Sequence, residues 1–174
     1  MKKLLSLFAL TCILYSCASD EENIPLDSFF EEPEVEDFSA QMSDFEEETL
    51  DFINAFRAET NDCGGEIHEP SFPLKWHPNL DAAAEAHAQY MFDNKILSHE
   101  GKDGSTLADR LVIAGYDARA FGENIAEGPS TPAQAVEAFK NSPSHCAVMS
   151  SPHFTQVGIS KIGKYWVFDF GTLK

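Results

Sequence analysis

Basic residues are scarce in this chain, and their scarcity excludes several classes of function. The 174 residues carry 12 Lys and Arg against 29 Asp and Glu, which gives a formal net charge of −17. Binding to nucleic acid requires a basic face that neutralises phosphates, so we expect no nucleic-acid partner. The same excess of acidic residues argues against electrostatic adsorption to an anionic lipid surface.

The chain also lacks a hydrophobic run long enough to cross a bilayer. Its longest apolar stretch, Leu4 to Tyr15, follows Lys2 and Lys3 and is typical of a secretory leader. The leader ends in Leu14-Tyr15-Ser16-Cys17, which resembles the lipobox of bacterial lipoproteins. The resemblance implies cleavage before Cys17 and acylation of that cysteine, which would attach the protein to a lipid bilayer. The alternative is a cleaved signal followed by an incidental cysteine.

Acidic residues are concentrated just after the leader. Residues 18–48 hold thirteen of the 29 acidic residues and no Lys or Arg, and Pro25 and Pro33 interrupt any periodicity. We therefore predict a leader over 1–16, the acylated cysteine with a disordered spacer over 17–42, and a globular domain over 43–174. The apolar residues of the spacer could instead dock onto the domain. Asp20-Glu21-Glu22 resembles an acidic export signal, so we expect an extracytoplasmic protein on the bacterial outer membrane, with exposure at the cell surface as an extension of that expectation.

Cysteines are few, and Cys17 is assigned to acylation. Cys63 and Cys146 are then the remaining pair in the domain of an exported protein, where a disulfide is the usual state. The alternative is a reactive Cys146 activated by the adjacent His145.

Hydrophobic spacing predicts four helices followed by a hairpin. We expect helices from Ser43, over about 79–94, over about 105–114, and from Thr131 to a stop at Pro143. Strands are predicted over 156–160 and 164–170, with a turn at Gly163 and a further short strand near 124–126. This order indicates an α+β layered domain. We expect Trp76, Trp166, Phe168 and His87 in the core, and His68, His77 and His153 at the surface or in turns.

Three residues at the ends of these elements are candidates for chemistry. His99 follows the second helix, His145 follows the fourth, and Glu123 lies between them beside Gly122. Two imidazoles and a carboxylate can form a three-ligand zinc site with an open position. The spacing matches no local metal motif, and histidines hydrogen-bonded to backbone are the ordinary alternative.

Beyond these single residues, an ordered series of motifs resembles the CAP superfamily, which comprises the cysteine-rich secretory, antigen 5 and pathogenesis-related 1 proteins and is also called the SCP domain. The similarity runs from about residue 45 to residue 173 and is strongest to the compact bacterial branch. The matching motifs are Phe52-Ile53-Asn54-Ala55-Phe56-Arg57, Leu74-Lys75-Trp76, Ser98-His99, Arg110 with Gly115-Tyr116, Gly122-Glu123-Asn124-Ile125-Ala126, Ser142-Pro143-Ser144-His145, Val157-Gly158 and Trp166 with Asp169-Phe170-Gly171.

The resemblance implies a three-layer α-β-α sandwich with a mostly antiparallel central sheet and a cleft that holds a His/Glu tetrad. His99, Glu123 and His145 match three members of the tetrad, while Ser142 stands where the second glutamate is expected. The resemblance also supports a Cys63–Cys146 bridge. We expect no required cofactor and at most weak zinc binding by His99 and His145, with Glu123 as a further ligand.

Three functions fit this description. The first is a monomeric, membrane-anchored binding module whose cleft of His99, Glu123, Ser142 and His145 holds a small apolar or lipid ligand or a partner segment. The second is a metal-dependent hydrolase or peptidase that uses His99, Glu123 and His145 as catalytic residues. The third is a structural or adhesion protein with a relic cleft. A serine hydrolase built on Ser142 or Ser144 with His145 lacks an orienting acid and an oxyanion motif.

Overall fold

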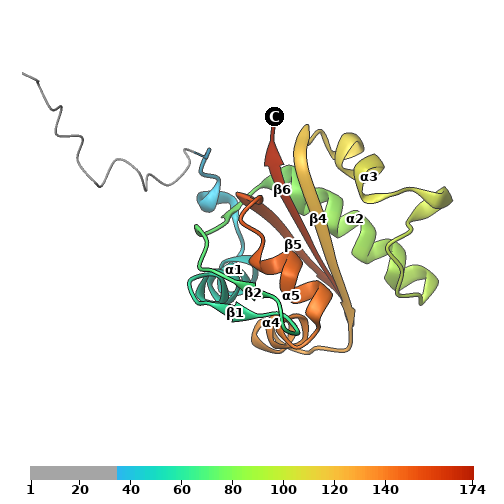
Figure 1. The fold of residues 1–174 in the computed structure, drawn as a ribbon. Helices are drawn as coiled ribbons and strands as arrows, with labels where there is room; N and C mark the ends of the chain where they lie inside the picture. Colours follow the sequence, from blue (N-terminus) through green and yellow to red (C-terminus); the bar gives the residue numbers. More distant parts are fainter. Residues whose placement is uncertain (1–34) are drawn as a thin grey trace, which may run out of the picture. The chain divides into compact units, whose positions relative to one another are not determined.

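The central element of the fold is a four-stranded sheet, seen in the computed structural model of the chain (Figure 1). The structure describes residues 35–174, so the predicted leader, Cys17 and residues 18–34 of the spacer lie outside the described residues. The strands are β3 (Lys75–Trp76), β5 (Gln156–Ile162), β6 (Tyr165–Leu173) and β4 (Ala118–Glu127), in that spatial order. β3 pairs parallel to β5, and the other two pairings are antiparallel.

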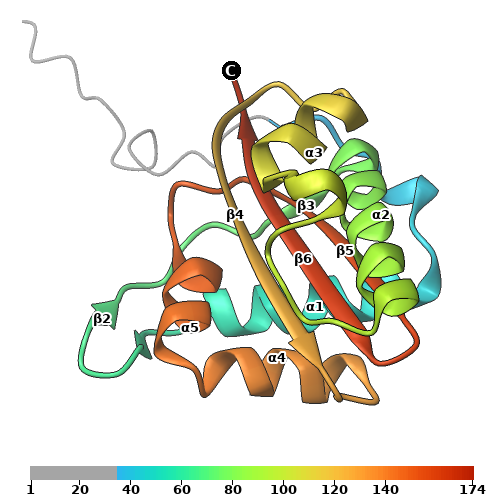
Figure 2. The ribbon, with the colours of Figure 1, turned by 90° about the vertical axis from the view of Figure 1, so that its right-hand side faces the viewer.

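Helices cover both faces of this sheet (Figures 1 and 2). α2 (Pro78–Asn94) and α3 (Leu107–Ala114) lie on one face, and α1 (Asp44–Arg57), α4 (Pro132–Lys140) and α5 (Pro143–Ser150) lie on the other. Two short 3-10 helices, η2 (Ser39–Gln41) and η3 (Lys102–Gly104), and a small hairpin of β1 (Asn61–Asp62) and β2 (Ile67–His68) complete the described part. The predicted α+β, three-layer α-β-α arrangement is confirmed.

Polar residues at the helix starts explain several of these boundaries. Ser43 caps α1, and Glu46 closes a capping box by accepting a hydrogen bond from the Ser43 backbone amide. Thr106 and Asp109 form the same arrangement at the start of α3, which ends at Gly115 with φ 79°. Such caps satisfy amide groups that have no partner within the helix. They place the loops that precede α1 and α3 in defined positions.

Residues of β6 alternate between two separate cores. Trp166, Phe168 and Phe170 are fully buried against α1, α4 and α5. Val167 packs with α2 on the opposite face. α2 lies so close to the sheet that a Cβ built on Gly158 of β5 would lie 2.1 Å from the backbone carbon of Leu80. Glycine is therefore required at Gly158 by the approach of the helix.

The structure corrects three details of the predicted elements. Pro143 does not mark the stop of a helix, because α4 ends at Lys140 and Pro143 begins α5 as its first helical residue. Proline fits that position since its missing amide would have no partner there. β4 is ten residues long, whereas only a short strand near 124–126 was predicted. The strand lies at the edge of the sheet, and its exposed positions obscure the apolar pattern in the sequence. His77 is buried rather than exposed, and its Nδ1 accepts a hydrogen bond from the Asn79 amide at the start of α2.

The described end of the acidic spacer contacts the domain. The ring of Phe38 packs edge-on against His77, with 4.9 Å between the ring centroids. The Lys75 ammonium donates a hydrogen bond to the Val35 carbonyl at 3.0 Å, and Met42 packs against the core. Residues 35–42 therefore lie on the domain surface beside the start of α2.

A disulfide joins Cys63 to Cys146, with 5.4 Å between the Cα atoms. It links the β1–β2 hairpin region to α5 and confirms the predicted bridge, which leaves no thiol at Cys146 for nucleophilic chemistry. Among residues 35–174, no helix is both long and apolar enough to cross a membrane.

Candidate functional site

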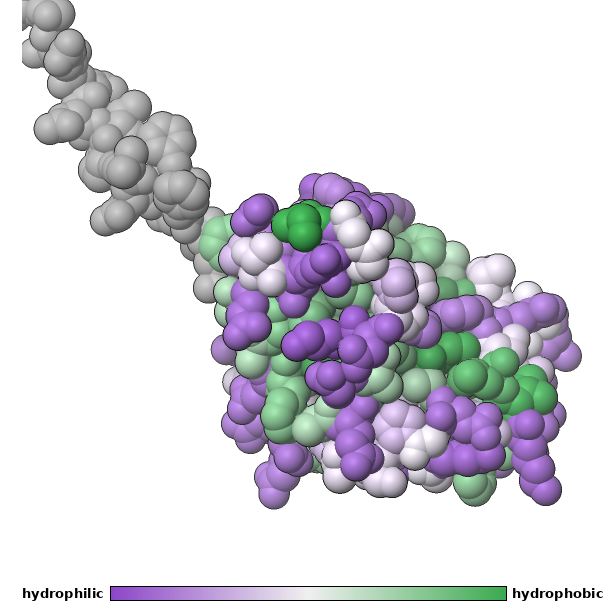
Figure 3. All heavy atoms as spheres, turned by 60° about the horizontal axis from the view of Figure 1, so that its bottom comes forward, coloured by the Kyte–Doolittle hydropathy of each residue, from purple (hydrophilic) through white to green (hydrophobic). Residues whose placement is uncertain are grey.

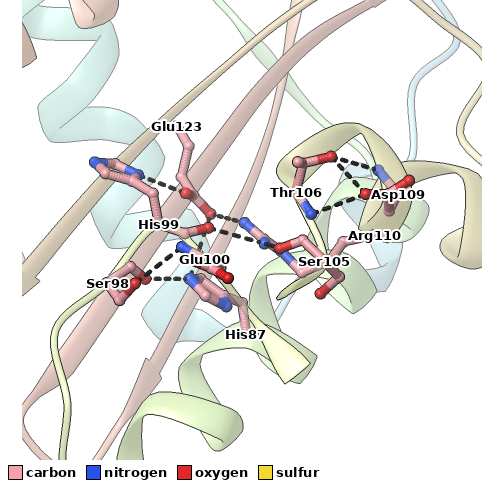
Figure 4. Close-up of polar contacts among 9 residues, drawn as sticks. All are labelled: His87, Ser98, His99, Glu100, Ser105, Thr106, Asp109, Arg110 and Glu123. Carbon is pink, nitrogen blue, oxygen red and sulfur yellow. Dashed lines mark hydrogen bonds and ion pairs between the residues drawn. The ribbon is translucent and has the colours of Figure 1, made fainter. Parts of the chain in front are cut away.

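Glu123 is the centre of a buried cluster of charged side chains (Figure 4). It lies on β4 directly opposite Asp169 of β6, and its side chain is 4% exposed. Its Oε1 lies 2.7 Å from the Nδ1 of His99, and its Oε2 forms an ion pair with the Arg110 guanidinium. The Nε2 of His87 lies 3.9 Å from the same Oε2. We call His87, His99, Arg110, Glu123 and Asp169 the Glu123 cluster.

His99 is the exposed member of the Glu123 cluster. Its side chain is 60% exposed, in a loop that begins where α2 ends. The bond from Nδ1 to Glu123 fixes the ring and leaves its other nitrogen, Nε2, facing away from the carboxylate (Figure 4). The structure therefore brings two of the predicted site residues together, His99 and Glu123.

Arg110 organises the segment that carries His99. From α3, its NH1 group donates to the carbonyls of His99 at 3.1 Å and Ser105 at 3.3 Å, while NH2 binds Glu123. Charge-assisted bonds of this kind are stronger than neutral ones. Sequence reasoning placed Arg110 in a motif and gave it no role. The available signal was a lone arginine on the buried face of a helix, beside Leu111.

His87 is a core residue, as predicted, and it also touches the Glu123 cluster. Its side chain is fully buried, and its Nε2 lies 2.8 Å from the Ser98 carbonyl. Because a carbonyl only accepts hydrogen bonds, Nε2 carries the proton in the neutral ring. Burial lowers the pKa of His87, although the Glu123 charge opposes this shift, so the ring favours the neutral form.

Asp169 lies beneath Glu123 and is fully buried on the α2 face of β6. Neither of its carboxylate oxygens has a hydrogen-bond partner among residues 35–174. Burial raises the pKa of Asp169 well above its ordinary value, and the charge of Glu123 adds to the rise. The Glu123 cluster therefore holds one negative charge, on Glu123, more readily than two.

His145 and Ser142 do not bond to the Glu123 cluster. Ser142 precedes α5 without forming a side-chain cap, and the His145 ring packs edge-on against Phe139, with 5.1 Å between centroids. The backbone carbonyl of His145 accepts a hydrogen bond from the Asn124 side chain on β4. Burial lowers the pKa of His145, and a charge on His99 lowers it further.

The predicted zinc ligands do not form a metal centre as arranged. Among the described residues 35–174, no group of three or more His, Cys, Asp or Glu side chains could hold a metal ion. Both oxygens of Glu123 are engaged, and the Nδ1 of His99 is bound to one of them. A metal would have to displace Arg110 or His99 from the carboxylate.

Two cavities adjoin the Glu123 cluster. The first, which we call the His99 cleft, has a volume of ≈460 Å³ and includes His99, Glu123, Phe121 and Leu107 in its lining. The second, the α2–α3 cavity, has a volume of ≈610 Å³ and includes His87 and Arg110. Both volumes fall in the range of roughly 300–1,000 Å³ that is typical of small-molecule sites.

Comparison with protein families gives one match that covers most of the chain. The sequence model described as "CAP: Cysteine-rich secretory protein family" matches residues 50–170. Among curated proteins, the chain is 31% identical to the uncharacterized protein YkwD of Bacillus subtilis over 100 residues, 56% of this chain and 39% of that protein. It is 29% identical to the uncharacterized membrane protein YlbC of the same organism over 129 residues, 72% of this chain and 34% of that protein. The chain thus spans little more than a third of the length of these relatives.

Solved structures with the same fold come from several organisms. An extracellular protein with an SCP domain from Bacillus anthracis matches with a TM-score of 0.66 and 25% identity, over 83% of this chain and 45% of that chain. An outer surface protein of Borrelia burgdorferi matches with a TM-score of 0.56 and 22% identity, over 73% of this chain and 94% of that chain. The second likeness concerns the fold alone.

Proposed function

The chain belongs to the cysteine-rich secretory protein (CAP) family, and from this premise we propose that it is an extracytoplasmic binding module, anchored to a bacterial membrane through acylated Cys17. Its ligand is a small apolar or lipid molecule, or an apolar segment of a partner, held in the His99 cleft. The names of two structural relatives, an extracellular protein and an outer surface protein, support a location outside the cytoplasm.

One observation carries this proposal: Glu123 is buried in the wall of the His99 cleft, with one oxygen hydrogen-bonded to His99 and the other in an ion pair with Arg110. A carboxylate that is held in this way stabilises the wall, and a metal or a substrate proton would compete with His99 or Arg110 for its oxygens. The opening beside it is lined by the half-exposed Phe121 and by Leu107. A rigid polar wall next to exposed apolar side chains suits recognition of an apolar ligand.

Lipid extraction tests the proposal directly. The mature chain, residues 17–174 with Cys17→Ser, is incubated with a bacterial total-lipid extract, isolated again and extracted with solvent. We expect a stoichiometric lipid in this protein and its loss in Phe121→Ser. Phe72→Ser is the matched control, because Phe72 is 45% exposed and Phe121 is 47% exposed. Equal lipid content in both variants would contradict a site at the His99 cleft, and so would no bound lipid in any of the three proteins.

The metal-dependent hydrolase remains a second candidate for one reason. His99 combines an exposed ring with an Nδ1 oriented by a carboxylate, which is how proteins commonly hold a histidine that acts as a base or binds a metal. We expect only weak zinc binding, weakened further in acid, because a protonated imidazole cannot bind a metal. Calorimetry with zinc on the wild type, His145→Ala and Ser142→Glu decides between the candidates. Nanomolar affinity that depends on His145 would favour the hydrolase.

A further inference from the structure

The α2–α3 cavity exists because the helices that border it carry small side chains. Ala82, Ala83 and Ala86 of α2 and Ala114 of α3 line it. The ring of Tyr90 is stacked on that of His87, with 6.2 Å between centroids and 14° between planes, and Ile113 at the opposite wall is 83% exposed. A leucine or phenylalanine at any of these alanines would occupy part of the space. The walls therefore offer an apolar slot with one flat aromatic side.

Two polar atoms beneath this slot lack partners. The Nδ1 of His87 and the Nε of Arg110 are buried without a hydrogen bond among residues 35–174. Because the Nε2 of neutral His87 donates to Ser98, its Nδ1 can only accept, whereas the Nε of Arg110 can only donate. The segment 101–105 packs over both side chains and contains Asp103 in the left-handed region, with φ 56°. A hydroxyl group within reach of both atoms would satisfy them, since it donates one hydrogen bond and accepts others.

The charges around the cavity favour an uncharged occupant. At its base, Arg110 is neutralised by Glu123. At its border, Lys102 stands with Asp93 and Asp103. A charged ligand that reached the base would lose its hydration without finding an unpaired charge there.

We propose that the α2–α3 cavity is a second ligand site, for an uncharged apolar molecule that carries a hydroxyl group. This site is separate from the His99 cleft of the proposed function. The two cavities share Ser105, and the Glu123 cluster contributes His87 and Arg110 to one and His99 and Glu123 to the other. The cluster is thus the common wall of two binding sites.

Three fragments with the same ring test the class of ligand: benzyl alcohol, benzoate and benzylamine. Each is titrated into the ¹⁵N-labelled mature chain, residues 17–174 with Cys17→Ser, while amide chemical shifts are recorded. We expect saturable shifts at Ala86, Tyr90 and Ile113 with benzyl alcohol, and affinities at least about tenfold weaker for the two charged fragments. Benzoate or benzylamine binding there as tightly as benzyl alcohol would overturn the uncharged class.

Substitution tests the location. Ala86→Phe fills the cavity and is expected to abolish the shifts caused by benzyl alcohol, whereas Ala138→Phe, at an exposed alanine of α4 outside the cavity, leaves them unchanged. Ile113→Asn, at an exposed position, makes the wall polar and should weaken binding without affecting the core. Unaltered benzyl alcohol binding in both cavity variants would refute the site. Lipid binding at the His99 cleft is measured on the same variants and should persist, so that failure of one site is distinguishable from failure of the other.

Discussion

The two faces of strand β6 differ in what they bury. Toward α1, α4 and α5 the strand presents Trp166, Phe168 and Phe170, whose rings pack with Phe139 and the disulfide. Toward α2 it presents Val167 and then Asp169, which lies under Glu123 and Arg110. Successive residues of one strand therefore belong to an apolar core and to an ionic cluster.

The two faces of the sheet therefore have different roles: the aromatic face stabilises the fold, and the ionic face borders the proposed ligand sites. Burial of aromatic rings is favourable without conditions on charge or pH. Buried ions stabilise only when every partner is present, because each carries a large cost of removal from water. On the face drawn in Figure 3, hydrophilic and hydrophobic residues are interspersed. Both cavities adjoin the Glu123 cluster. The ionic face is therefore the side on which we place the ligand sites.

The largest effect is expected on the apolar face. Phe168→Ala removes a fully buried ring and should lower the free energy of unfolding by about 4 kcal/mol. Urea unfolding followed by circular dichroism measures the loss. Val112→Ala, at a 76% exposed position of α3, is the control and should change the free energy by less than about 0.5 kcal/mol. A loss below 1 kcal/mol for Phe168→Ala would show that this face does not form the main core.

A somewhat smaller effect is expected when the ionic face is broken. Arg110→Met leaves Glu123 buried without its cation and should cost about 3 kcal/mol. Adding Glu123→Gln removes the unpaired charge, so the double variant should recover part of the loss. A double-mutant cycle of unfolding free energies measures the coupling. If the losses of unfolding free energy in Arg110→Met and Glu123→Gln simply add in the double variant, Arg110 and Glu123 are not coupled. That result would contradict the view that this face depends on paired ions.

The ionic face also makes stability depend on pH through Asp169. Its pKa is raised in the folded protein, so the folded state keeps a proton that the unfolded state releases above about pH 4. Its contribution is therefore largest in acid and declines as pH rises toward the folded pKa. Asp169→Asn should remove this decline, so its stability relative to the wild type should increase from pH 4 to pH 8.

Four other groups with shifted pKa values, Asp81, His77, His87 and His145, also contribute to the pH dependence, so only the difference between variant and wild type is informative. Burial raises the pKa of Asp81 to about 7, which acts in the same direction. His87, with a lowered pKa, acts in the opposite direction, because the unfolded chain binds a proton below about pH 6.5 that the folded chain refuses. A pH-independent difference would contradict the assignment to Asp169.

The smallest effect is expected at the edge of the apolar face, where Phe38 packs. From composition alone, deletion of residues 18–42 should leave the melting temperature nearly unchanged. Because Phe38 contacts His77, we expect the part from residue 35 onward to contribute about 1 kcal/mol, or a few degrees. Scanning calorimetry on variants that lack residues 18–34 or residues 18–42 measures the contribution of residues 35–42 to the melting temperature. Equal melting temperatures would show that the contact adds nothing.

Much of the fold could be predicted because local signals agreed with each other. Helix boundaries are marked by backbone hydrogen bonds between near neighbours in the sequence. The residues involved are Ser43 with Glu46, Thr131 with Pro132, and Gly115. Pro143 was misread because a proline is compatible with the position after one helix and with the first position of the next. Only the short connection between α4 and α5 decides between them.

The site was harder to predict, because its contacts join residues distant in sequence. His99 and Glu123 were found through their motifs, whereas the roles of Arg110 and Asp169 depend on how α3 and β6 pack around Glu123. No periodicity reveals that a buried arginine pairs with Glu123 or that a buried aspartate lies opposite it. The resemblance also placed His145 beside His99 and Glu123. In the structure the contact of its ring is with Phe139.

The order of the strands has a consequence for how the protein is made. β6, the last strand of the chain, lies between β4 and β5 in the middle of the sheet, and it pairs with both along most of its length. β4 has no other partner in the four-stranded sheet, and β5 is otherwise paired only with the two residues of β3. A chain that stops at residue 164 would lack β6 and with it the middle of the sheet. The sheet can therefore close only after residues 165–173 are available, which places its assembly late in synthesis.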